Sequence, residues 1–365
     1  MARHLAASRE VHVLTSIGAE QESGVHVSST IGSWSDTSGL LRQFDLLPRK
    51  AAIVWQYVPH MYGRGGINPG LPAVMGALRA AGRHQIVIIH EMMAPLSWRP
   101  RFLWCAWNHR LQWRRIRAVA DRLALSTERW IEQCSAREPA LAPKLSLLPS
   151  PSNISSVTVS EHHRKDWRRQ FGWTSEMRVI AYFGSVAAGK KIEWVYRAWE
   201  AAESELGPTA LVIAGRQREH IRPESIHRHY RVLGHLPSVE LGELLRAVDV
   251  LALPFMDGVS ERRSSFMAGL EAGAPVATTL GFSTGKTLRG ADYLAAVAEN
   301  DLKGYCDVVV RLLGDESRRR DLSARGQAAY QERYSWEIVI HRLEGLIDGL
   351  TSGGVRPSKS VTVSR

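Results

Sequence analysis

Residues 248–280 contain the pattern that most restricts the fold of this chain. The apolar run 248–253 has the length of a buried strand, and a polar loop follows it. Either Ser264 or Ser265 can cap a short helix, which Gly273 closes just before the next apolar run begins. A strand, a loop, a helix and a second strand in this order predict a parallel sheet with helices on its faces.

The polar loop of this pattern carries the first candidate site. It contains Ser260, Glu261, Arg262 and Arg263 and ends where the helix begins at Ser264. In an open parallel sheet, ligands bind outside the carboxyl ends of the strands. Two guanidinium groups beside a helix N-terminus would favour an anion, most simply a phosphate. The alternative is a solvated loop with two surface arginines.

Strand and helix signals alternate along the rest of the chain, which predicts an α/β protein. The chain has 365 residues, a length that suggests two domains, and the Pro- and Ser-rich residues 149–153 form a boundary. Strands are expected at 11–14, 52–57, 85–90, 122–126, 144–148, 178–183, 209–214, 230–233, 248–253 and 275–278.

Composition limits the class and the partners of the protein. Cys105, Cys134 and Cys306 have no metal-ligand spacing and form no disulfide framework. No apolar run approaches the ~20 residues of a membrane span, and no signal peptide is evident, so we expect a cytoplasmic protein. The net charge of +11 suits nucleotide-sugar diphosphates or anionic lipid surfaces. Nucleic acid is not expected, because the chain has no zinc-finger spacing or aromatic RNA-binding signature.

The pattern at 248–280 also resembles a known family. The run D-V-x-x-x-P from Asp249, the Ala-rich helix that ends in G-x-P-V, and G-V-S-x-R-R-x-S from Gly258 to Ser265 are similar to the donor-binding region of family 4 glycosyltransferases of the GT-B fold. The stretch from Gly258 to Ser265 resembles the corresponding loop of a bacterial subgroup of that family. With gaps, the resemblance extends over nearly the whole chain.

The resemblance implies two Rossmann-like domains that face each other across a cleft. An acceptor-side domain would span 1–152 and be completed by a C-terminal helix at 335–350, and a donor-binding domain would span 153–334. Residues 352–365 are expected to be a disordered tail. The first βα unit of the family does not occur ahead of the strand at 11–14. Either the true start of the protein lies upstream of Met1, or the N-terminal domain lacks this unit.

The resemblance also implies the residues that hold the donor. Gly184 and Lys190 lie in a small-residue loop after a strand, and Lys190 matches a family lysine on the donor diphosphate. Where the family has an arginine directly after the glycine, this chain has Ser185. The positive charge of Arg262 or Arg263 would replace the charge of that arginine. Arg216 follows another strand of the donor domain, and we expect Arg216, Ser260 and Ser264 to contact the donor as well. The neighbouring Gly215 could also be explained by the turn that it forms.

Two further positions concern catalysis. The run H-E-x-x-A-P that begins at His90 is similar to the segment whose histidine faces the donor sugar. The family pair Glu-x7-Glu falls on Ser260 and Ala268, so neither glutamate is in place. Glu261 is one residue from the first position, and we expect it to serve the sugar. A lone histidine or glutamate can equally be structural.

Residues 97–117 carry four tryptophans and six arginines. This composition suits a membrane interface, where a lipid-linked acceptor would lie. We favour the alternative, a helix that packs its aromatic side chains into the N-terminal domain and solvates its arginines.

These observations favour a retaining glycosyltransferase that uses a nucleotide-sugar donor. Its acceptor would be a sugar, a lipid-linked molecule or a small molecule. No metal or other cofactor is expected, since the chain has no Asp-x-Asp and Lys190 and the arginines would neutralise the diphosphate. The main alternative is a catalytically inactive glycosyltransferase-like partner protein. A sugar epimerase of the same fold and a charge-driven membrane or nucleic-acid adaptor are weaker alternatives.

Overall fold

The structure is a computed structural model that describes residues 1–93, 98–154, 161–174, 176–185, 191–215, 222 and 227–351, with only the backbone given for 161–165. The chain divides into two compact units. The first unit comprises Met1–Ser126, Gln133–Leu148 and the chain from Val339 on. The second comprises Thr127–Glu132 and Pro149–Ile338. Both consist of parallel strands and helices, which confirms the predicted α/β class.

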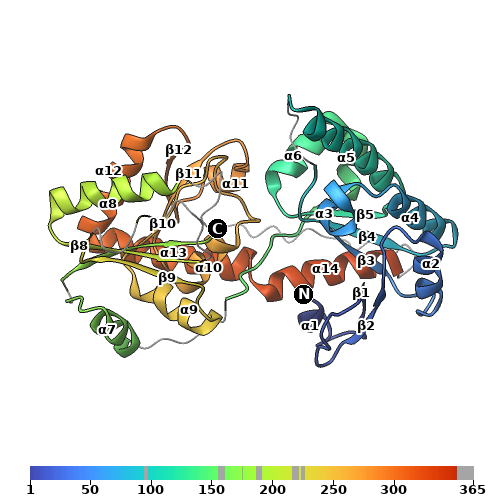
Figure 1. Ribbon diagram of the computed structural model, residues 1–365, viewed down its shortest axis with the longest axis horizontal. Helices are drawn as coiled ribbons and strands as arrows, with labels where there is room; N and C mark the ends of the chain where they lie inside the picture. Colours follow the sequence, from blue (N-terminus) through green and yellow to red (C-terminus); the bar gives the residue numbers. More distant parts are fainter. Residues whose placement is uncertain are drawn as a thin grey trace, which may run out of the picture. The chain divides into compact units, whose positions relative to one another are not determined.

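The first unit contains two separate parallel sheets (Figure 1). One has four strands in the order β3-β4-β5-β6, and the other pairs β1 with β2. The strands are β1 His12–Ser16, β2 His26–Ile31, β3 Ile53–Tyr57, β4 Gln85–Ile89, β5 Arg122–Leu125 and β6 Leu145–Leu147. The helices are α1 Ala2–Leu5, α2 Thr37–Asp45, α3 Pro59–Tyr62, α4 Gly70–Ala80, α5 Pro100–Val119, α6 Glu128–Arg137, which continues from the second unit, and α14 Trp336–Thr351, with short 3₁₀ turns at Arg64–Gly66 and Pro139–Lys144.

The core of the first unit forms because its central strands are apolar on both faces. All five residues of β4 are buried, as expected for a strand covered by helices on both sides. Ile86 and Ile88 pack with Leu343 and Ile347 of α14. On Trp55 the indole N–H donates to Gln85 Oε1 at 3.0 Å, which satisfies a polar group inside this core.

The second unit is one six-stranded parallel sheet in the order β12-β11-β10-β7-β8-β9. Helices α8 and α12 cover one face, and α9 and α10 cover the other (Figure 1). The strands are β7 Arg178–Phe183, β8 Thr209–Ala214, β9 Tyr230–Gly234, β10 Val250–Leu253, β11 Val276–Leu280 and β12 Ala295–Ala298. The helices are α7 Glu161–Gln170, α8 Ile192–Leu206, α9 Ser238–Ala247, α10 Ser264–Ala272, α11 Lys286–Arg289, α12 Leu302–Gly314 and α13 Glu316–Arg333.

A buried ion pair stabilises the start of this sheet. Arg168 Nη2 lies 2.7 Å from Asp249 Oδ2, and both side chains are almost fully buried. The same carboxylate oxygen accepts from the backbone N–H of Val179 at 2.8 Å. A buried carboxylate needs such partners, so Asp249 of the D-V motif serves the architecture of the sheet and lies at the opposite end of β10 from the loop.

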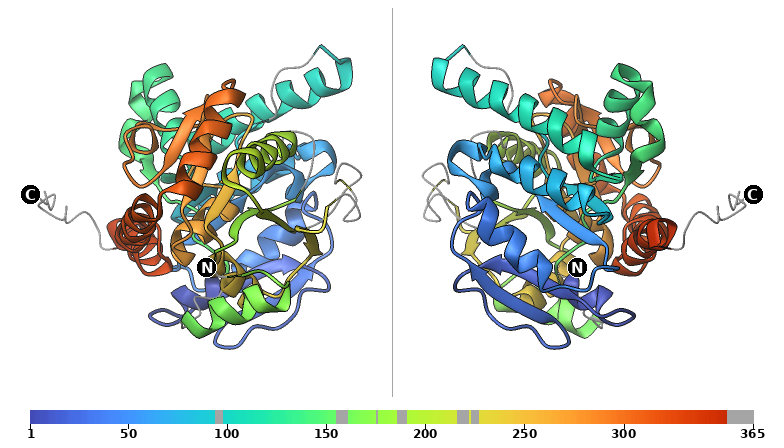
Figure 2. Two further views of the ribbon diagram at one scale, coloured as in Figure 1. Left: turned by 90° about the vertical axis from the view of Figure 1, so that its left-hand side faces the viewer. Right: turned by 90° about the vertical axis from the view of Figure 1, so that its right-hand side faces the viewer.

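Two sequence expectations are wrong in detail. Arg263 is the N-cap residue of α10 and no side chain caps this helix, so neither Ser264 nor Ser265 does so. Most aromatic side chains at 97–117 are also not packed inside. Trp98, Trp104 and Trp107 are 102%, 64% and 59% exposed, and among the four tryptophans only Trp113 is buried. Figure 2 shows the start of this helix projecting from the first unit.

Candidate functional site

The connectivity of the second sheet creates a place for a ligand between β7 and β10. From β7 the chain moves outward through β8 to β9, and it then returns to the other side of β7 and continues through β10, β11 and β12. Where the strand order reverses, the loops at the carboxyl ends of adjacent strands diverge and leave a crevice. The loops after Phe183 and Leu253 flank this point.

Glycines at the ends of β7 and β8 let the backbone approach this point closely. Gly184 has φ +142° and Gly215 has φ +128°, values that other residues rarely adopt. A Cβ at Gly215 would lie 2.3 Å from the carbonyl oxygen of Gly184. A Cβ at Gly184 would meet nothing closer than Tyr182 at 3.8 Å and Ser265 at 4.0 Å. The first turn of α10 is therefore next to Gly184.

The loop between β10 and α10 is held in a defined shape. Gly258 has φ +86°, and a Cβ there would lie 2.2 Å from the backbone nitrogen of Gly281. The N–H of Val259 donates to the carbonyl of Thr279 at 2.8 Å, and the hydroxyl of Ser283 donates to Asp257 at 2.8 Å. These contacts fix the loop against the residues that follow β11.

The two arginines of this loop have different partners. Arg263 forms a close ion pair with Asp257 and lies over the ring of Phe255. Arg262 is 3.9 Å from the nearest oxygen of Asp257 and lies over the ring of Trp130 at 5.3 Å. Since Arg263 already pairs with a carboxylate, Arg262 is the better placed of the two to bind an added anion.

Glu261 is the most unusual ionisable group of the loop. It is 1% exposed, and its Oε2 has no hydrogen-bond partner among the described residues. Burial, assisted by the negative charge of Glu128, raises the pKa of this carboxyl to about 7, although the backbone N–H groups of Glu261 and Glu128 donate to it and oppose the rise. A glutamic acid that titrates near neutral pH can donate a hydrogen bond as well as accept one.

The neighbouring serines are also placed at this helix start. Ser260 is fully buried, and within the described part of the chain its hydroxyl has no hydrogen-bond partner. Ser264 is the first residue of α10, whose first-turn N–H groups have no partner within the helix. The start of α10, whose first N–H groups are not bonded within the helix, lies next to Arg262 and is suited to an anionic group.

The structure also locates the positions where glutamates were missing. Ala268 is buried inside α10, so it offers nothing to a ligand. Glu271 is half-buried, and its carboxylate is hydrogen-bonded to the side chain of Ser152. Glu271 therefore does not replace the absent second glutamate.

His90 lies in the first unit, directly after β4. Its backbone N–H donates to the carbonyl of Tyr57 at 3.0 Å, and its Nε2 is 2.6 Å from Oε1 of Gln56. Burial lowers the pKa of His90, although the charge of Glu91 partly opposes this. The imidazole is therefore neutral at pH 7 and held by Gln56 in one orientation.

Two of the predicted donor contacts, Lys190 and Arg216, lie outside the described residues. The adjacent Lys191 is described. Its Nζ donates to the carbonyl of Glu299 and is 3.9 Å from the ring centroid of Trp194. Lys191 thus has a structural role at the start of α8.

Sequence reasoning missed the residues of 127–132 that belong to this unit. The carboxylate of Glu128 accepts from the N–H and the hydroxyl of Thr287 at 2.7 and 2.9 Å. Trp130 lies under Arg262. No pattern in the sequence signals these contacts, because they join segments more than 130 residues apart, as their numbering shows.

A second surface of interest lies on α5. Its exposed apolar side chains are accompanied by exposed arginines, and no acidic residue occurs between 92 and 120. The exposed members are Trp98, Phe102, Leu103, Trp104, Trp107 and Leu111, with Arg99, Arg101, Arg114 and Arg115. We call this set the α5 patch. No helix in the described ranges is long and apolar enough to cross a bilayer.

Comparison with known proteins supports the family resemblance. Residues 177–315 match the family model of glycosyl transferases group 1. These residues include the crevice loops after β7 and β10. A curated relative, the GDP-mannose-dependent monoacylated alpha-(1-6)-phosphatidylinositol monomannoside mannosyltransferase of Corynebacterium glutamicum, is 25% identical over 215 residues. The match covers 56% of this chain and 56% of the relative, so the chain spans about half the length of that protein.

Solved structures share the fold over most of the chain. Sucrose-phosphate synthase from Thermosynechococcus elongatus matches with a TM-score of 0.69 and 15% identity, covering 97% of this chain and 92% of the other. WaaG, a glycosyltransferase of lipopolysaccharide biosynthesis, matches with 0.60 and 15%, covering 97% and 94%. Anabaena HepE in complex with UDP and glucose matches with 0.65 and 11%, covering 88% and 85%. The predicted GT-B fold is confirmed.

Proposed function

We propose that the chain is a glycosyltransferase that moves a sugar from a nucleotide-sugar donor to an acceptor. The observation that carries this proposal is the reversal of strand order between β7 and β10. It brings together the close backbone of Gly184, the start of α10, Arg262 and the buried Glu261. These groups have the chemistry that a sugar diphosphate requires, namely donors for its phosphates and a carboxyl group for its hydroxyls.

The residues have distinct roles in this proposal. Arg262, with Lys190, binds the diphosphate and stabilises the negative charge that develops on it as the sugar leaves. Arg263 holds the loop through Asp257 and adds positive charge. Glu261 and the neutral His90 hydrogen-bond to the sugar. Gly184, Arg216, Ser260 and Ser264 complete the donor contacts.

Transfer is proposed to proceed with retention of configuration and without a metal ion. The chain contains no Asp-x-Asp, the spacing that often holds a metal at a sugar diphosphate. Fixed positive groups placed where the leaving-group charge develops can supply the same stabilisation. The donor is proposed to be a nucleoside diphosphate sugar, in line with the GDP-mannose named for the relative and the UDP bound to HepE.

Thermal unfolding with a panel of GDP, UDP, ADP and their sugar conjugates tests this proposal. A ligand at about 100 times its Kd stabilises the native state by about 2.7 kcal/mol. We expect a rise in Tm with one base, a smaller rise in Arg262→Ala and Lys190→Ala, and an unchanged rise in Arg320→Ala, an exposed control in the same unit. A folded wild-type chain that responds to no nucleotide would refute the donor site.

The acceptor is proposed to be reached at a membrane surface through the α5 patch. Exposed tryptophans beside arginines favour the interface of an anionic bilayer, and each arginine near such a surface contributes about 1 kcal/mol. We expect the chain to co-sediment with vesicles containing about one third anionic phospholipid and not with neutral vesicles. Trp104→Ala and Trp107→Ala should each weaken binding roughly tenfold, whereas Leu46→Ala, an exposed control, should not.

A second candidate is an inactive glycosyltransferase-like partner protein. The small residues Ser260 and Ala268 where the family has glutamates favour it. A transfer assay separates the active enzyme from the inactive partner. It uses the labelled form of the donor that raises Tm and measures transfer of the sugar to a lipid acceptor, a sugar acceptor or water. Binding with no turnover under any of these conditions would support the inactive partner.

A further inference from the structure

Two short segments of the first unit carry the same tripeptide, Val-His-Val, at 11–13 and at 25–27. Successive side chains of an extended strand point to opposite faces, so the histidine of each tripeptide faces away from its valines. Val25 is buried and the other three valines are half-buried, whereas His12 and His26 are both exposed. The repeated pattern therefore places one histidine of each segment on a solvent-facing side.

The pairing of β1 with β2 brings these two histidines together. The strands are parallel, and His12 lies directly opposite His26. The backbone N–H of His26 donates to the carbonyl of Val11 at 2.9 Å, which holds this register. The two imidazole rings are stacked, with centroids 4.7 Å apart and an angle of 19° between the ring planes. The backbone register thus fixes the distance between the two rings.

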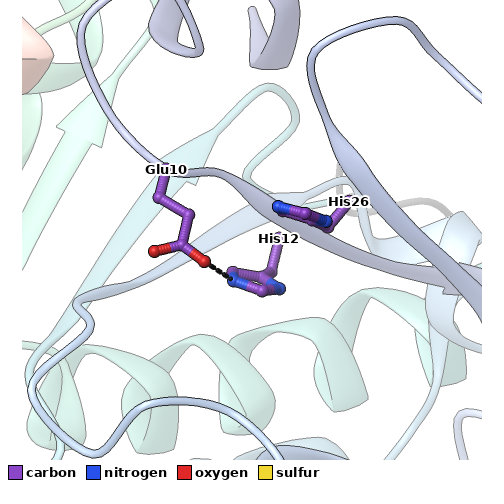
Figure 3. Close-up of side chains that lie close together, drawn as sticks. All are labelled: Glu10, His12 and His26. Carbon is purple, nitrogen blue, oxygen red and sulfur yellow. Dashed lines mark hydrogen bonds and ion pairs between the residues drawn. The ribbon is translucent and has the colours of Figure 1, made fainter.

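A carboxylate completes the cluster (Figure 3). Glu10 precedes His12 by two residues, the spacing that returns a side chain to the same face of an extended segment. Glu10 Oε1 is 2.9 Å from His12 Nε2. One ligand atom from each of Glu10, His12 and His26 lies within 4.8 Å of the other two, and all three residues are exposed. Within the described ranges, no other three residues with histidine, cysteine or carboxylate side chains lie this close together.

The positive charge next to this cluster is already paired. Arg9 precedes Glu10 in the chain, and a free guanidinium group there would oppose the binding of a cation. Its Nη2 donates to both carboxylate oxygens of Asp348 in α14, at 2.8 and 2.9 Å. This ion pair neutralises Arg9 and attaches the chain just ahead of Glu10 to α14.

The geometry points to a site for one divalent transition-metal ion, such as Zn²⁺, bound by Glu10, His12 and His26. Two imidazoles and a carboxylate are a known ligand set for zinc, with water in the fourth position. Bonds of about 2.1 Å in a tetrahedral site place ligands roughly 3.4 Å apart, so these side chains need to move by about 1 Å. Mg²⁺ and Ca²⁺ prefer oxygen ligands and are not suited to the two imidazoles.

The bound ion has a structural role, because it connects β1 to β2 through side chains as well as through the backbone. A pair of strands has little stability by itself, so an added link between the two strands should stabilise this sheet. The unfolded chain does not hold the three ligands in this arrangement, so the ion binds the folded chain preferentially and raises its stability. None of the residues proposed to hold the nucleotide sugar belongs to this cluster.

A second pair of histidines, in the second unit, provides a matched control. The rings of His227 and His229 have centroids 5.5 Å apart, but their nitrogen atoms are engaged. His227 Nδ1 accepts from the backbone N–H of His229 at 3.2 Å, and His229 Nε2 accepts from Nε of Arg228 at 2.9 Å. Because lone pairs used in hydrogen bonds cannot bind a metal and the arginine repels a cation, substitution of His229 should not change zinc binding.

Equilibrium dialysis of the full chain, without added histidines, against ZnCl₂ tests this site. We expect one bound ion per chain that MgCl₂ does not displace. Affinity should fall at least tenfold in Glu10→Gln, His12→Asn and His26→Asn, and should stay unchanged in His229→Asn. Because the three ligands are exposed, their variants should have the wild-type Tm in the absence of zinc. Zinc binding that persists in both histidine variants, or no stoichiometric binding to the wild type, would refute the assignment.

Thermal unfolding and hydrogen exchange test the structural role. Zinc should raise the Tm of the wild type and slow amide exchange of His26, whose N–H donates to Val11, and His12→Asn should lose both effects. A nucleotide that raises the Tm of the wild type should raise the Tm of His12→Asn equally, because this residue is not part of the proposed donor site. Zinc binding that leaves exchange of His26 unchanged, or a zinc-dependent rise in Tm that remains in His12→Asn, would contradict the proposed link between β1 and β2.

Discussion

The buried carboxyl group of Glu261 makes the stability of the second unit depend on pH. Burial raises its pKa from 4.5 to about 7 in the folded chain. Between these values the folded state holds a proton that the unfolded state has lost, so the free energy of unfolding falls as the pH rises. Each pKa unit corresponds to about 1.4 kcal/mol, and the shift therefore corresponds to a loss of about 3 kcal/mol between pH 4.5 and pH 7.

The substitution Glu261→Gln isolates this contribution. Glutamine has nearly the same shape but no ionisable proton, so the variant should lack the loss that the wild type shows. Urea unfolding at pH 5 and at pH 8 should give a wild-type free energy that falls, relative to the variant, by about 3 kcal/mol. Glu240→Gln, an exposed control on α9, should follow the wild type.

The result that would refute this reasoning is a parallel pH dependence of the wild type and Glu261→Gln. Such a result would mean that the carboxyl group is ionised and hydrated in the folded chain. It would also remove the basis for a protonated Glu261 that donates to the sugar. A difference of opposite sign would show that a cation stabilises the carboxylate more than burial destabilises it.

Other predictions concern neighbouring groups. Gly215→Ala should destabilise the second unit by about 1–3 kcal/mol in urea unfolding, because its Cβ would lie 2.3 Å from the Gly184 carbonyl oxygen. Gly207→Ala is the control: it has open space around it and should cost only about 1 kcal/mol. Arg263→Ala should lower the free energy of unfolding by about 1 kcal/mol through loss of the partly exposed Asp257 pair, and an unchanged Tm would contradict this role. Burial lowers the pKa of His90, so as the pH falls the histidine binds a proton in the unfolded chain before it does so in the folded chain. The free energy of unfolding should therefore fall below about pH 6.5. The variant His90→Asn should not show this loss when Tm is measured across about pH 5–8.

Much of the fold could be predicted from local patterns. Strands such as β7 and β8 were predicted at the bounds that the structure gives, because continuous apolar runs between turn residues are typical of buried parallel strands. By contrast, β2, α2 and β12 were not predicted. Their apolar residues are few or of the small type, and their conformation depends on the elements that they contact.

The α5 helix shows where local reasoning failed. Its position was predicted well, but its tryptophans were expected inside. A sequence with aromatic and basic residues on most of its faces does not specify which side is covered, and only the packing of Trp113 and Ile116 reveals that. The prediction of the α10 cap was wrong for a similar reason, since Arg263 and the two adjacent serines are all compatible with a helix start.

The sequence by itself determined the α/β class, the positions of most strands along the chain and the loop that carries Glu261, Arg262 and Arg263. These features depend on periodicity and on residues that are close in the chain. Only the tertiary structure decided which charges are available. It pairs Arg263 with Asp257, leaves Arg262 at 3.9 Å from that carboxylate and buries Glu261 beside Glu128. Electrostatic environment depends on burial and on distances between segments remote in sequence, and neither is encoded in local spacing.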